Sequence, residues 1–308
     1  MRKNYENDAA RLGLALAEFE RTQFPLPGIT NDEARAVFID QIIDSEQRVL
    51  YTDRLLRRDL DPLAEDPASD SFDPLKAAIL LNRRGNFDEA VWMVYLFVHF
   101  GKHRRSGWRY IRDIYGRLGQ GGRWNWADTS ADPTAFRFWL DANQDELKDP
   151  SRPHGFGNHR KYESLAAWTE RGTGAAVQSY VEWVLAAGGD HQQRFTEAEK
   201  LGPEDGFDYL YRSMRDVRQF GRIARFDYLT MLGKLDLLAI TPPHSYLIGA
   251  TGPLMGARLL LDDHASSAKV VQGRLQLLAD GAKIPPHVLE DAVCNWQKAP
   301  TKYAKFSG

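Results

Sequence analysis

The chain has one cysteine, Cys294, among its 308 residues. A single thiol excludes an intramolecular disulfide and any metal site of the CxxC kind, and it suits a reducing compartment. Long apolar runs are also missing, because VWMVYLFVHF (91–100) is about half as long as a membrane-spanning helix. The N-terminal MRKNYENDAARLG lacks the apolar segment of a secretory signal. We therefore expect a cytoplasmic protein with no membrane association.

Several signatures of catalysis are absent as well. The chain contains no HExxH zinc motif, no GxSxG nucleophile motif and no P-loop. His99 and His103 stand four residues apart, but no further motif completes a metal site around them. We expect neither a metal nor another cofactor, and a nucleophilic hydrolase is disfavoured.

Charge is nearly balanced, with a formal net charge of −2 and a pI near 6.5. This excludes a bulk polycation that coats nucleic acid. It does not exclude a local basic surface, because electrostatic steering depends on the distribution of charge.

What the sequence does contain is helical periodicity, with almost no period-two alternation. It predicts an all-α fold. Residues 59–74 carry six acids and three prolines, which is typical of a linker or mobile loop. We expect an N-terminal helical segment with this acidic linker at 1–75 and a second region at 76–308. Expected helices cover about 5–22, 32–57, 86–101, 106–118 with Ser106 as N-cap, 133–146, 174–188, 206–219, 222–236, 252–262, 265–280 and 286–296.

Positive charge gathers in RSMRDVRQFGRIARFDYL (212–229), which holds five arginines and two acids. The Phe-Gly step at 220–221 predicts a helix, a tight turn and a second helix. The amides that open a helix bind anions, and flanking arginines add bidentate phosphate contacts. The alternative is a solvated helix face whose arginines pair with nearby acids. Both interpretations stay open on the residues alone.

A second basic cluster, KHRRSGWRYIRDIYGR (102–117), interleaves arginines with aromatic residues. Arginine binds phosphate and aromatic rings stack on bases, so the cluster fits nucleic acid. An equally good interpretation places the aromatic residues in the core and the arginines on the outer face. The arginines and aromatic residues to which both interpretations apply are Arg105, Arg109, Arg112, Trp108, Tyr110 and Tyr115.

Two further segments concentrate functional residue types. FGNHRKYESL (156–165) is dense in hydrogen-bonding side chains, which suits a polar pocket, although an exposed loop has the same composition. GATGPLMGARLLL (249–261) places three glycines around the start of an apolar helix. It is similar to a phosphate-binding loop, but close helix packing also explains such glycines.

Taken in order, FGNHRKYESL, VRQFGRIARFDYL, YLIGATGPLMGARLL and LEDAVCNWQKAPTKY resemble the α-glutamyl/putrescinyl thymine pyrophosphorylase family. The resemblance spans about residues 85–303. That family is related to helix-hairpin-helix DNA glycosylases and includes anti-phage members. The resemblance implies two helical lobes with a cleft between them, and double-stranded DNA carrying modified bases as partner. Protein partners are not indicated.

The resemblance also implies roles for residues. The hairpin glycine would be Gly221, and the DNA-binding set would be Arg105, Arg109, Lys161, Arg218, Gly221, Arg222, Arg225, Gly249, Thr251, Gly252 and Arg258. The base pocket would be Asn158, His159, Arg160, Tyr162 and Glu163. Many related glycosylases carry a catalytic aspartate about 20 residues after the hairpin glycine, where this chain reads AITPPHS (239–245) without an acid. Asp227 is then the first catalytic candidate, Glu290 the second and Asp236 the third.

The expected activity is excision of a hypermodified pyrimidine, such as glucosylated hydroxymethylcytosine, from phage DNA. The base would be flipped out and a carboxylate would assist hydrolysis of the N-glycosidic bond. The hairpin lacks a lysine placed as in glycosylase/lyases, which favours a monofunctional enzyme. One alternative is a transferase acting on pyrophosphorylated 5-hydroxymethylpyrimidine in DNA. Another is a DNA-binding module without catalysis.

Overall fold

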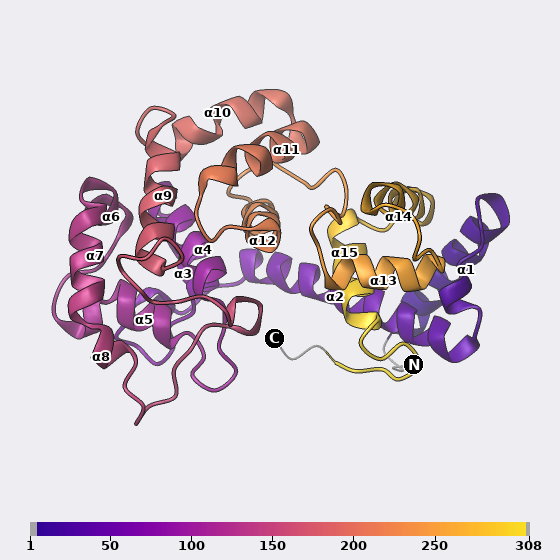
Figure 1. Cartoon of the computed structure of the whole chain (residues 1–308), viewed down its shortest axis with the longest axis horizontal. Helices are drawn as coiled ribbons and strands as arrows, with labels where there is room; N and C mark the ends of the chain where they lie inside the picture. The colour runs from indigo at the N-terminus through magenta and orange to yellow at the C-terminus, as the bar shows by residue number, and fades with distance from the viewer. Residues whose placement is uncertain (1–4, 306–308) are drawn as a thin grey trace. The chain divides into compact units, whose positions relative to one another are not determined.

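A computed structural model describes residues 5–305, and within that range the chain is built of helices and turns without a strand (Figure 1). The predicted all-α class is confirmed. The helices are α1 (Glu6–Thr22), α2 (Asp32–Arg57), α3 (Pro74–Arg83), α4 (Phe87–Phe100), α5 (Arg109–Tyr115), α6 (Trp126–Ala131), α7 (Pro133–Ala142), α8 (Gln144–Leu147), α9 (Thr173–Leu185), α10 (His191–Leu201), α11 (Pro203–Ser213), α12 (Arg222–Lys234), α13 (Gly252–Leu261), α14 (Ala268–Ala282) and α15 (Pro286–Trp296).

Asp-Pro pairs set two of the helix starts. The Asp73 carboxylate accepts hydrogen bonds from the amides of Leu75 and Lys76, and Pro74 occupies the first helical position. Asp132 and Pro133 begin α7 in the same way. An aspartate satisfies amides that have no partner inside the helix, and proline is preformed for the first turn.

Some predicted boundaries are wrong. The helix expected from 106 begins at Arg109, and Ser106 instead closes a tight turn in which its hydroxyl lies 2.7 Å from Nδ1 of His103. The helix expected to reach 219 ends at Ser213. Helices α3, α6 and α10 were not predicted. Helix α6 has six residues, α10 buries only three side chains, and the apolar α3 directly follows the acidic segment that was expected to be a linker.

The described residues divide into two compact units. The first combines residues 5–52 with 242–305, and the second is the continuous stretch 53–241. The first unit is therefore built from the two ends of the chain.

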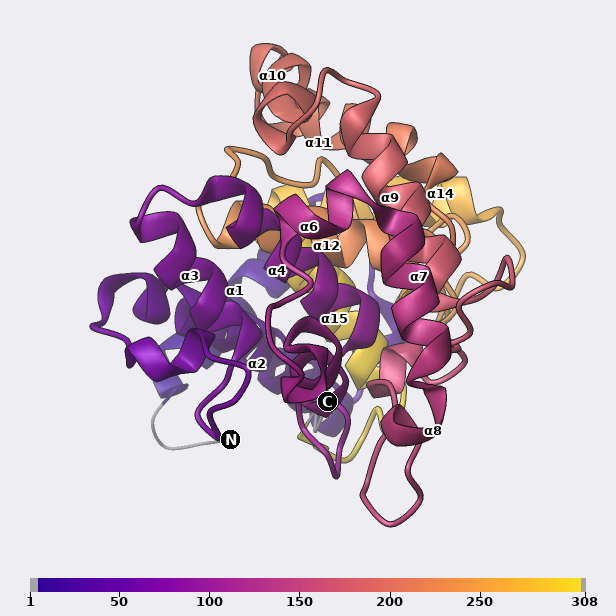
Figure 2. The ribbon, with the colours of Figure 1, turned by 90° about the vertical axis from the view of Figure 1, so that its left-hand side faces the viewer.

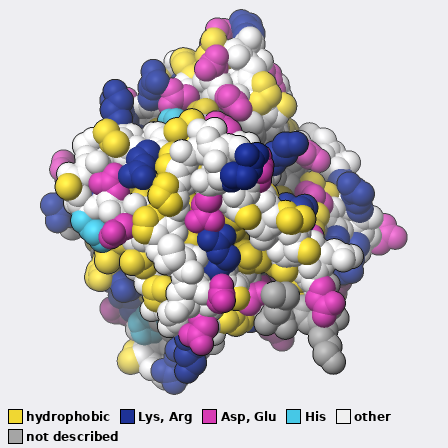
Figure 3. All heavy atoms as spheres, turned by 90° about the vertical axis from the view of Figure 1, so that its right-hand side faces the viewer, with side chains coloured by type: hydrophobic (Ala, Val, Ile, Leu, Met, Phe, Trp, Pro, Cys, Tyr) yellow, Lys and Arg dark blue, Asp and Glu magenta, His cyan; other side chains and the backbone are white. Residues whose placement is uncertain are grey.

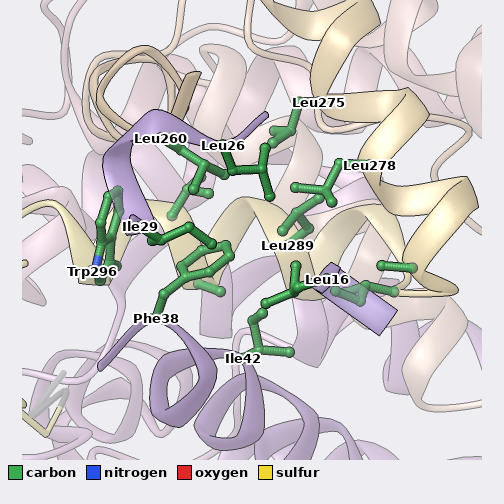
Figure 4. Close-up of a cluster of buried hydrophobic side chains, with 14 of the residues drawn as sticks. Leu16, Leu26, Ile29, Phe38, Ile42, Leu260, Leu275, Leu278, Leu289 and Trp296 are labelled. Carbon is green, nitrogen blue, oxygen red and sulfur yellow. The ribbon is translucent and has the colours of Figure 1, made fainter. Parts of the chain in front are cut away.

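The core of the first unit joins helices from both ends (Figure 4). Leu16 of α1 and Phe38 of α2 lie among Leu260, Leu289 and Trp296, all fully or almost fully buried. The rings of Phe38 and Trp296 meet edge to face, with 5.3 Å between centroids. This cluster explains why segments more than 200 residues apart fold together.

Helices α13 and α15 approach each other closely inside this unit. A Cβ on Gly256 would lie 2.1 Å from the carbonyl oxygen of Val293. Gly256 thus serves close helix packing, which was one of the two interpretations of its motif.

The second unit is organised around α4, which is buried along most of its length. Trp92 and Tyr95 of α4 stack with each other and with Tyr180 of α9. Helices α3, α10 and α12 also pack on α4, while α7 and α9 lie side by side (Figure 2). An apolar stretch this short and this buried is a core helix. None of the helices within residues 5–305 is long and apolar enough to cross a membrane.

The acidic segment 59–74 contains a 3-10 turn, Pro62–Glu65. Ala64 and Phe72 are buried, and the Asp73 amide donates to the carbonyl oxygen of Ala64 at 2.9 Å. The segment belongs to the second unit and is attached to it at these two residues, while most of its other side chains are exposed or half-buried.

One face of the molecule mixes charges of both signs. On the face drawn in Figure 3, basic and acidic side chains are interspersed among white and yellow atoms rather than gathered by sign. Such a face suits a chain with a net charge of −2.

Candidate functional site

The arginine-rich stretch forms a helical hairpin in the second unit. Helix α11 is followed by a 3-10 turn, Met214–Asp216, and α12 begins at Arg222. The residue with left-handed backbone is Gln219 (φ 58°), and its side chain donates to the carbonyl oxygen of Arg171 at 2.6 Å. Gly221 is the N-cap with φ −66°, and a Cβ there would meet nothing within 4 Å. The space beside the Cα of Gly221, at the start of α12, is therefore open.

The hairpin arginines divide into two groups. Arg225 donates to the Tyr211 carbonyl oxygen at 3.0 Å and its guanidinium lies over the Tyr211 ring. Arg222 is buried with its guanidinium over the Phe226 ring. Arg225 thus joins α12 to α11, whereas Arg222 packs along its own helix. The role of both as DNA ligands stays a prediction. Arg218 is exposed and pairs with Glu170 at 3.3 Å, an interaction that solvent weakens.

The FGNHRKYE segment is fixed to the C-terminal end of α4. The Gly157 amide donates to the Phe100 carbonyl oxygen at 2.8 Å, and Arg160 Nε donates to that of Val98 at 2.9 Å. A Cβ on Gly157 would approach the backbone of Gly101 to 2.8 Å. A cation at a helix C-terminus is stabilised by the carbonyl dipoles. This anchoring explains why Arg160 is buried in a segment that is otherwise largely exposed.

Asp227 on α12 interacts with this segment. Its side chain reaches solvent, yet the surrounding protein desolvates it and raises the pKa of its carboxyl group. Arg160 is the strongest of the charges that oppose this rise, followed by His159. Burial likewise raises the pKa of Glu163, against the pull of Arg160. The structure thus brings together the first catalytic candidate and three of the five predicted base-pocket residues.

Two buried donors in this site have no hydrogen-bond partner within residues 5–305. They are Nη2 of Arg160 and the hydroxyl of Tyr95. Burial raises the pKa of Tyr95 well above its ordinary value, and burial lowers that of Arg160. Buried polar groups are almost always paired, so two unpaired donors beside two carboxyl groups indicate a place for a polar ligand. Tyr95 was missed from the sequence, because it stands within an apolar helix and looks like any core aromatic residue.

A buried chain of hydrogen bonds supports α12. His191 Nδ1 lies 2.6 Å from the Asp88 carboxylate, His191 Nε2 lies 2.8 Å from the Tyr180 hydroxyl, and that hydroxyl lies 2.8 Å from the Tyr228 hydroxyl. Burial raises the pKa of Asp88, but the hydrogen bonds from His191 outweigh it and the net shift is downward. Tyr228 directly follows Asp227, so the network fixes the helix that presents the carboxylate.

Two predicted base-pocket residues and one catalytic candidate lie at the surface of the second unit. Tyr162 is 90% exposed with Lys161 over its ring, and Asn158 is exposed. Asp236 is exposed with φ 52°, two residues beyond the end of α12.

Four predicted DNA ligands and Glu290 belong to the first unit. Gly249 is exposed with φ 80° and Thr251 is exposed before α13, whereas a Cβ on Gly252 would lie 2.8 Å from Sγ of Cys294. Arg258 donates to the carbonyl oxygen of Ser266 at 3.1 Å. Glu290 is 9% exposed on α15.

The second basic cluster is only partly available to a ligand. Tyr110 and Tyr115 are buried, and the Tyr115 hydroxyl donates to Glu89 at 2.7 Å. These two rings are core residues and are not exposed for stacking on bases. Within residues 5–305, no three side chains of His, Cys, Asp or Glu are grouped as a metal ion would require.

Comparison with known families gives one match. The sequence model of alpha-glutamyl/putrescinyl thymine pyrophosphorylase clade 3 matches residues 33–308. The match extends further toward the N-terminus than the motifs at 85–303 and includes most of α2. No curated protein and no solved structure matches the chain.

Proposed function

The chain belongs to the alpha-glutamyl/putrescinyl thymine pyrophosphorylase clade 3 family, and from that premise we propose that it is a DNA glycosylase that excises a hypermodified pyrimidine. The family description concerns modified thymine, so the substrate is a DNA base with a bulky substituent. Phage DNA that carries such bases is the proposed source.

One observation carries this proposal: a solvent-reaching carboxylate, Asp227, acts electrostatically on a buried guanidinium with an unused donor, Arg160. Cleavage of an N-glycosidic bond separates charge, because the sugar becomes cationic and the departing pyrimidine anionic. A carboxylate stabilises the first and buried N–H or O–H donors stabilise the second. Arg160 and Tyr95 supply such donors.

The proposed steps use only groups of this chain, the DNA and water. The bond between C1′ and the pyrimidine nitrogen breaks, and its electron pair leaves with the base. Asp227 stabilises the cationic sugar and orients a water molecule that adds to C1′. The proton lost by the water ends on the released base, and the products are free base and an abasic site.

DNA would be held by the hairpin and the exposed groups near it. The open space beside Gly221, at the N-terminus of α12, suits a backbone phosphate, and the exposed Arg218 and Lys161 add positive charge. Flipping the target nucleotide costs a few kcal/mol, which these contacts offset.

The test is base release from DNA of phages with modified pyrimidines, followed by alkali. Asp227→Asn should lower the rate of release about 100-fold or more, because loss of one stabilising group of this kind has that effect. The matched control is Asp236→Asn, two residues beyond the end of α12, where asparagine tolerates the positive φ. If Asp227→Asn keeps full turnover, the assignment of the carboxylate is wrong.

A second candidate is a transferase that replaces pyrophosphate on a 5-hydroxymethylpyrimidine in DNA. The family description favours it, and the unused donor of Arg160 would also suit a pyrophosphate leaving group. Alkali-sensitive breaks without free pyrophosphate support the glycosylase, whereas an intact backbone with a new base adduct supports the transferase. Binding with neither product leaves a DNA-binding module.

A further inference from the structure

Two adjoining hollows lie on the second unit at the base of α5. They have volumes of about 320 and 350 Å³ and share Arg112, Asp113 and Arg152. The smaller one is rich in positive charge, since four arginines and one aspartate line it, together with Ser106. The arginines are Arg105, Arg109, Arg112 and Arg152.

The guanidinium group of one of these arginines is already occupied by contacts within the protein. Arg109 donates from Nε to Asp113 at 2.9 Å and from Nη1 to the carbonyl oxygens of Arg152 and Pro153 at 3.1 and 2.9 Å. Its Nη2 faces the carbonyl oxygen of Glu146 at 3.4 Å. Arg109 therefore ties the 146–153 segment to α5 and neutralises Asp113, so it builds the hollow and leaves ligand binding to its neighbours.

The other three arginines are weakly paired. Arg112 faces Asp70 at 3.4 Å, and that aspartate is fully exposed. Its Nε is buried without a hydrogen-bond partner within residues 5–305. Arg152 faces Asp149 at 3.4 Å. Arg105 is exposed and makes no ion pair with an acid of the described chain. Long, exposed pairs contribute little, so an incoming anion can replace them.

The larger hollow adds backbone donors. Its rim is the glycine turn after α5, with positive φ at Gly119, Gly121 and Gly122 (76°, 85° and 75°). The amides of Gly119 and Gln120 donate within the turn to the carbonyl oxygens of Gly116 and Arg117, which leaves the amides of Gly121 and Gly122 as the donors on the rim. Backbone amides in such a turn bind anions. Two acids on this side are paired, Asp113 with Arg109 and Asp66 with Arg123, and Glu146 also lines the hollow.

We propose that the smaller hollow binds a phosphoryl group through Arg105, Arg112 and Arg152, with the glycine turn contacting the rest of the ligand. The paired N–H groups of a guanidinium match the oxygens of phosphate, and several guanidinium groups line this one small hollow. The group comes either from the DNA backbone or from a free ligand such as pyrophosphate. This site is independent of the chemistry proposed at Asp227.

The experiment measures binding by the full-length chain without turnover. Calorimetry with inorganic pyrophosphate forms one arm, and fluorescence anisotropy with an unmodified 20-base-pair duplex over a salt series forms the other. The variants are Arg112→Gln and Arg152→Gln, with Arg57→Gln as control, because Arg57 is exposed in the same unit and does not line either hollow. Circular dichroism verifies that each variant is folded.

Each site variant should weaken binding about tenfold, since it removes a charge-assisted hydrogen bond. A loss confined to DNA, with the salt slope reduced by about one, identifies a backbone phosphate. A loss confined to pyrophosphate identifies a free ligand. Folded variants that bind both probes like the wild type overturn the proposal, and so does an equal loss in Arg57→Gln. Because no base release is measured, neither outcome depends on the glycosylase assignment.

Discussion

His99 on α4 is a buried side chain whose protonation state affects the stability of the folded protein. It is 1% exposed, and Nε2 lies 3.0 Å from the hydroxyl of Thr173. That hydroxyl donates to the carbonyl oxygen of Ser164, so its oxygen accepts and the neutral imidazole carries its proton on Nε2. Burial, aided by Arg160, lowers the pKa of His99 to about 3.

A pH dependence of stability follows. Between about pH 6.5 and pH 3 the unfolded state binds a proton on His99 that the folded state does not, so stability decreases as pH falls. The slope contributed by one such group is about 1.4 kcal/mol per pH unit. The measurement is the free energy of unfolding by urea from pH 7 to pH 5, for wild type and His99→Gln. The difference between the two should shrink toward acid, and a constant difference would contradict the assignment.

For single residues, the sequence indicated which side chains are candidates for the site, but not which contacts they make. It selected Arg160 and Asp227 from separate motifs, and in the folded chain the charges of these two side chains interact. It also grouped Arg222 and Arg225 with the phosphate ligands, a role that stays a prediction, and it gave no sign that both guanidinium groups lie over aromatic rings of the hairpin. Spacing along a helix predicts which side chains share a face, but not whether that face meets solvent or another helix.

At the scale of elements, two helical glycines have opposite surroundings. Gly256 of α13 touches α15, where a Cβ would overlap the Val293 carbonyl oxygen. Gly273 lies exposed in the interior of α14, and a Cβ at that position would meet no atom within 4 Å.

Alanine at these positions should therefore act in opposite directions. Gly256→Ala forces α13 and α15 apart and should lower the free energy of unfolding by about 1–3 kcal/mol. Gly273→Ala gains helix propensity without a clash and should raise it by about 0.5–1 kcal/mol. Urea titrations of both variants check this, and equal effects of the two would show that propensity alone governs them.

Helices α2 and α15 were predicted with the bounds that the structure shows, 32–57 and 286–296. Helix α10 was missed, since HQQRFTEAEKL buries only His191, Phe195 and Ala198. The chain of hydrogen bonds through Asp88, His191 and Tyr180 could not be predicted from the sequence for another reason. Its members stand up to 103 positions apart, and no local pattern records such a contact.

At the scale of the molecule, the first and second units have separate cores, and the only cysteine reports on the first. Cys294 lies half-buried on α15 against Gly252. Reaction of its thiol with a disulfide reagent therefore measures opening of that unit.

Core truncations should separate the units by this readout. Leu16→Ala removes a fully buried side chain of the first unit and should destabilise it by about 2–5 kcal/mol, which accelerates labelling of Cys294. Phe136→Ala truncates a fully buried residue of the second unit and should leave the labelling rate unchanged. If both variants accelerate labelling equally, the units open as one.

The composition of the first unit from both chain ends has a consequence for biosynthesis. The second unit is one continuous stretch, so it can fold as soon as it leaves the ribosome. The apolar face of α1 and α2 must wait until α13, α14 and α15 have been made, roughly 200 residues later. During that interval Leu12, Leu16 and Phe38 lack their final partners, which makes the N-terminal helices the segment of the nascent chain most in need of a chaperone.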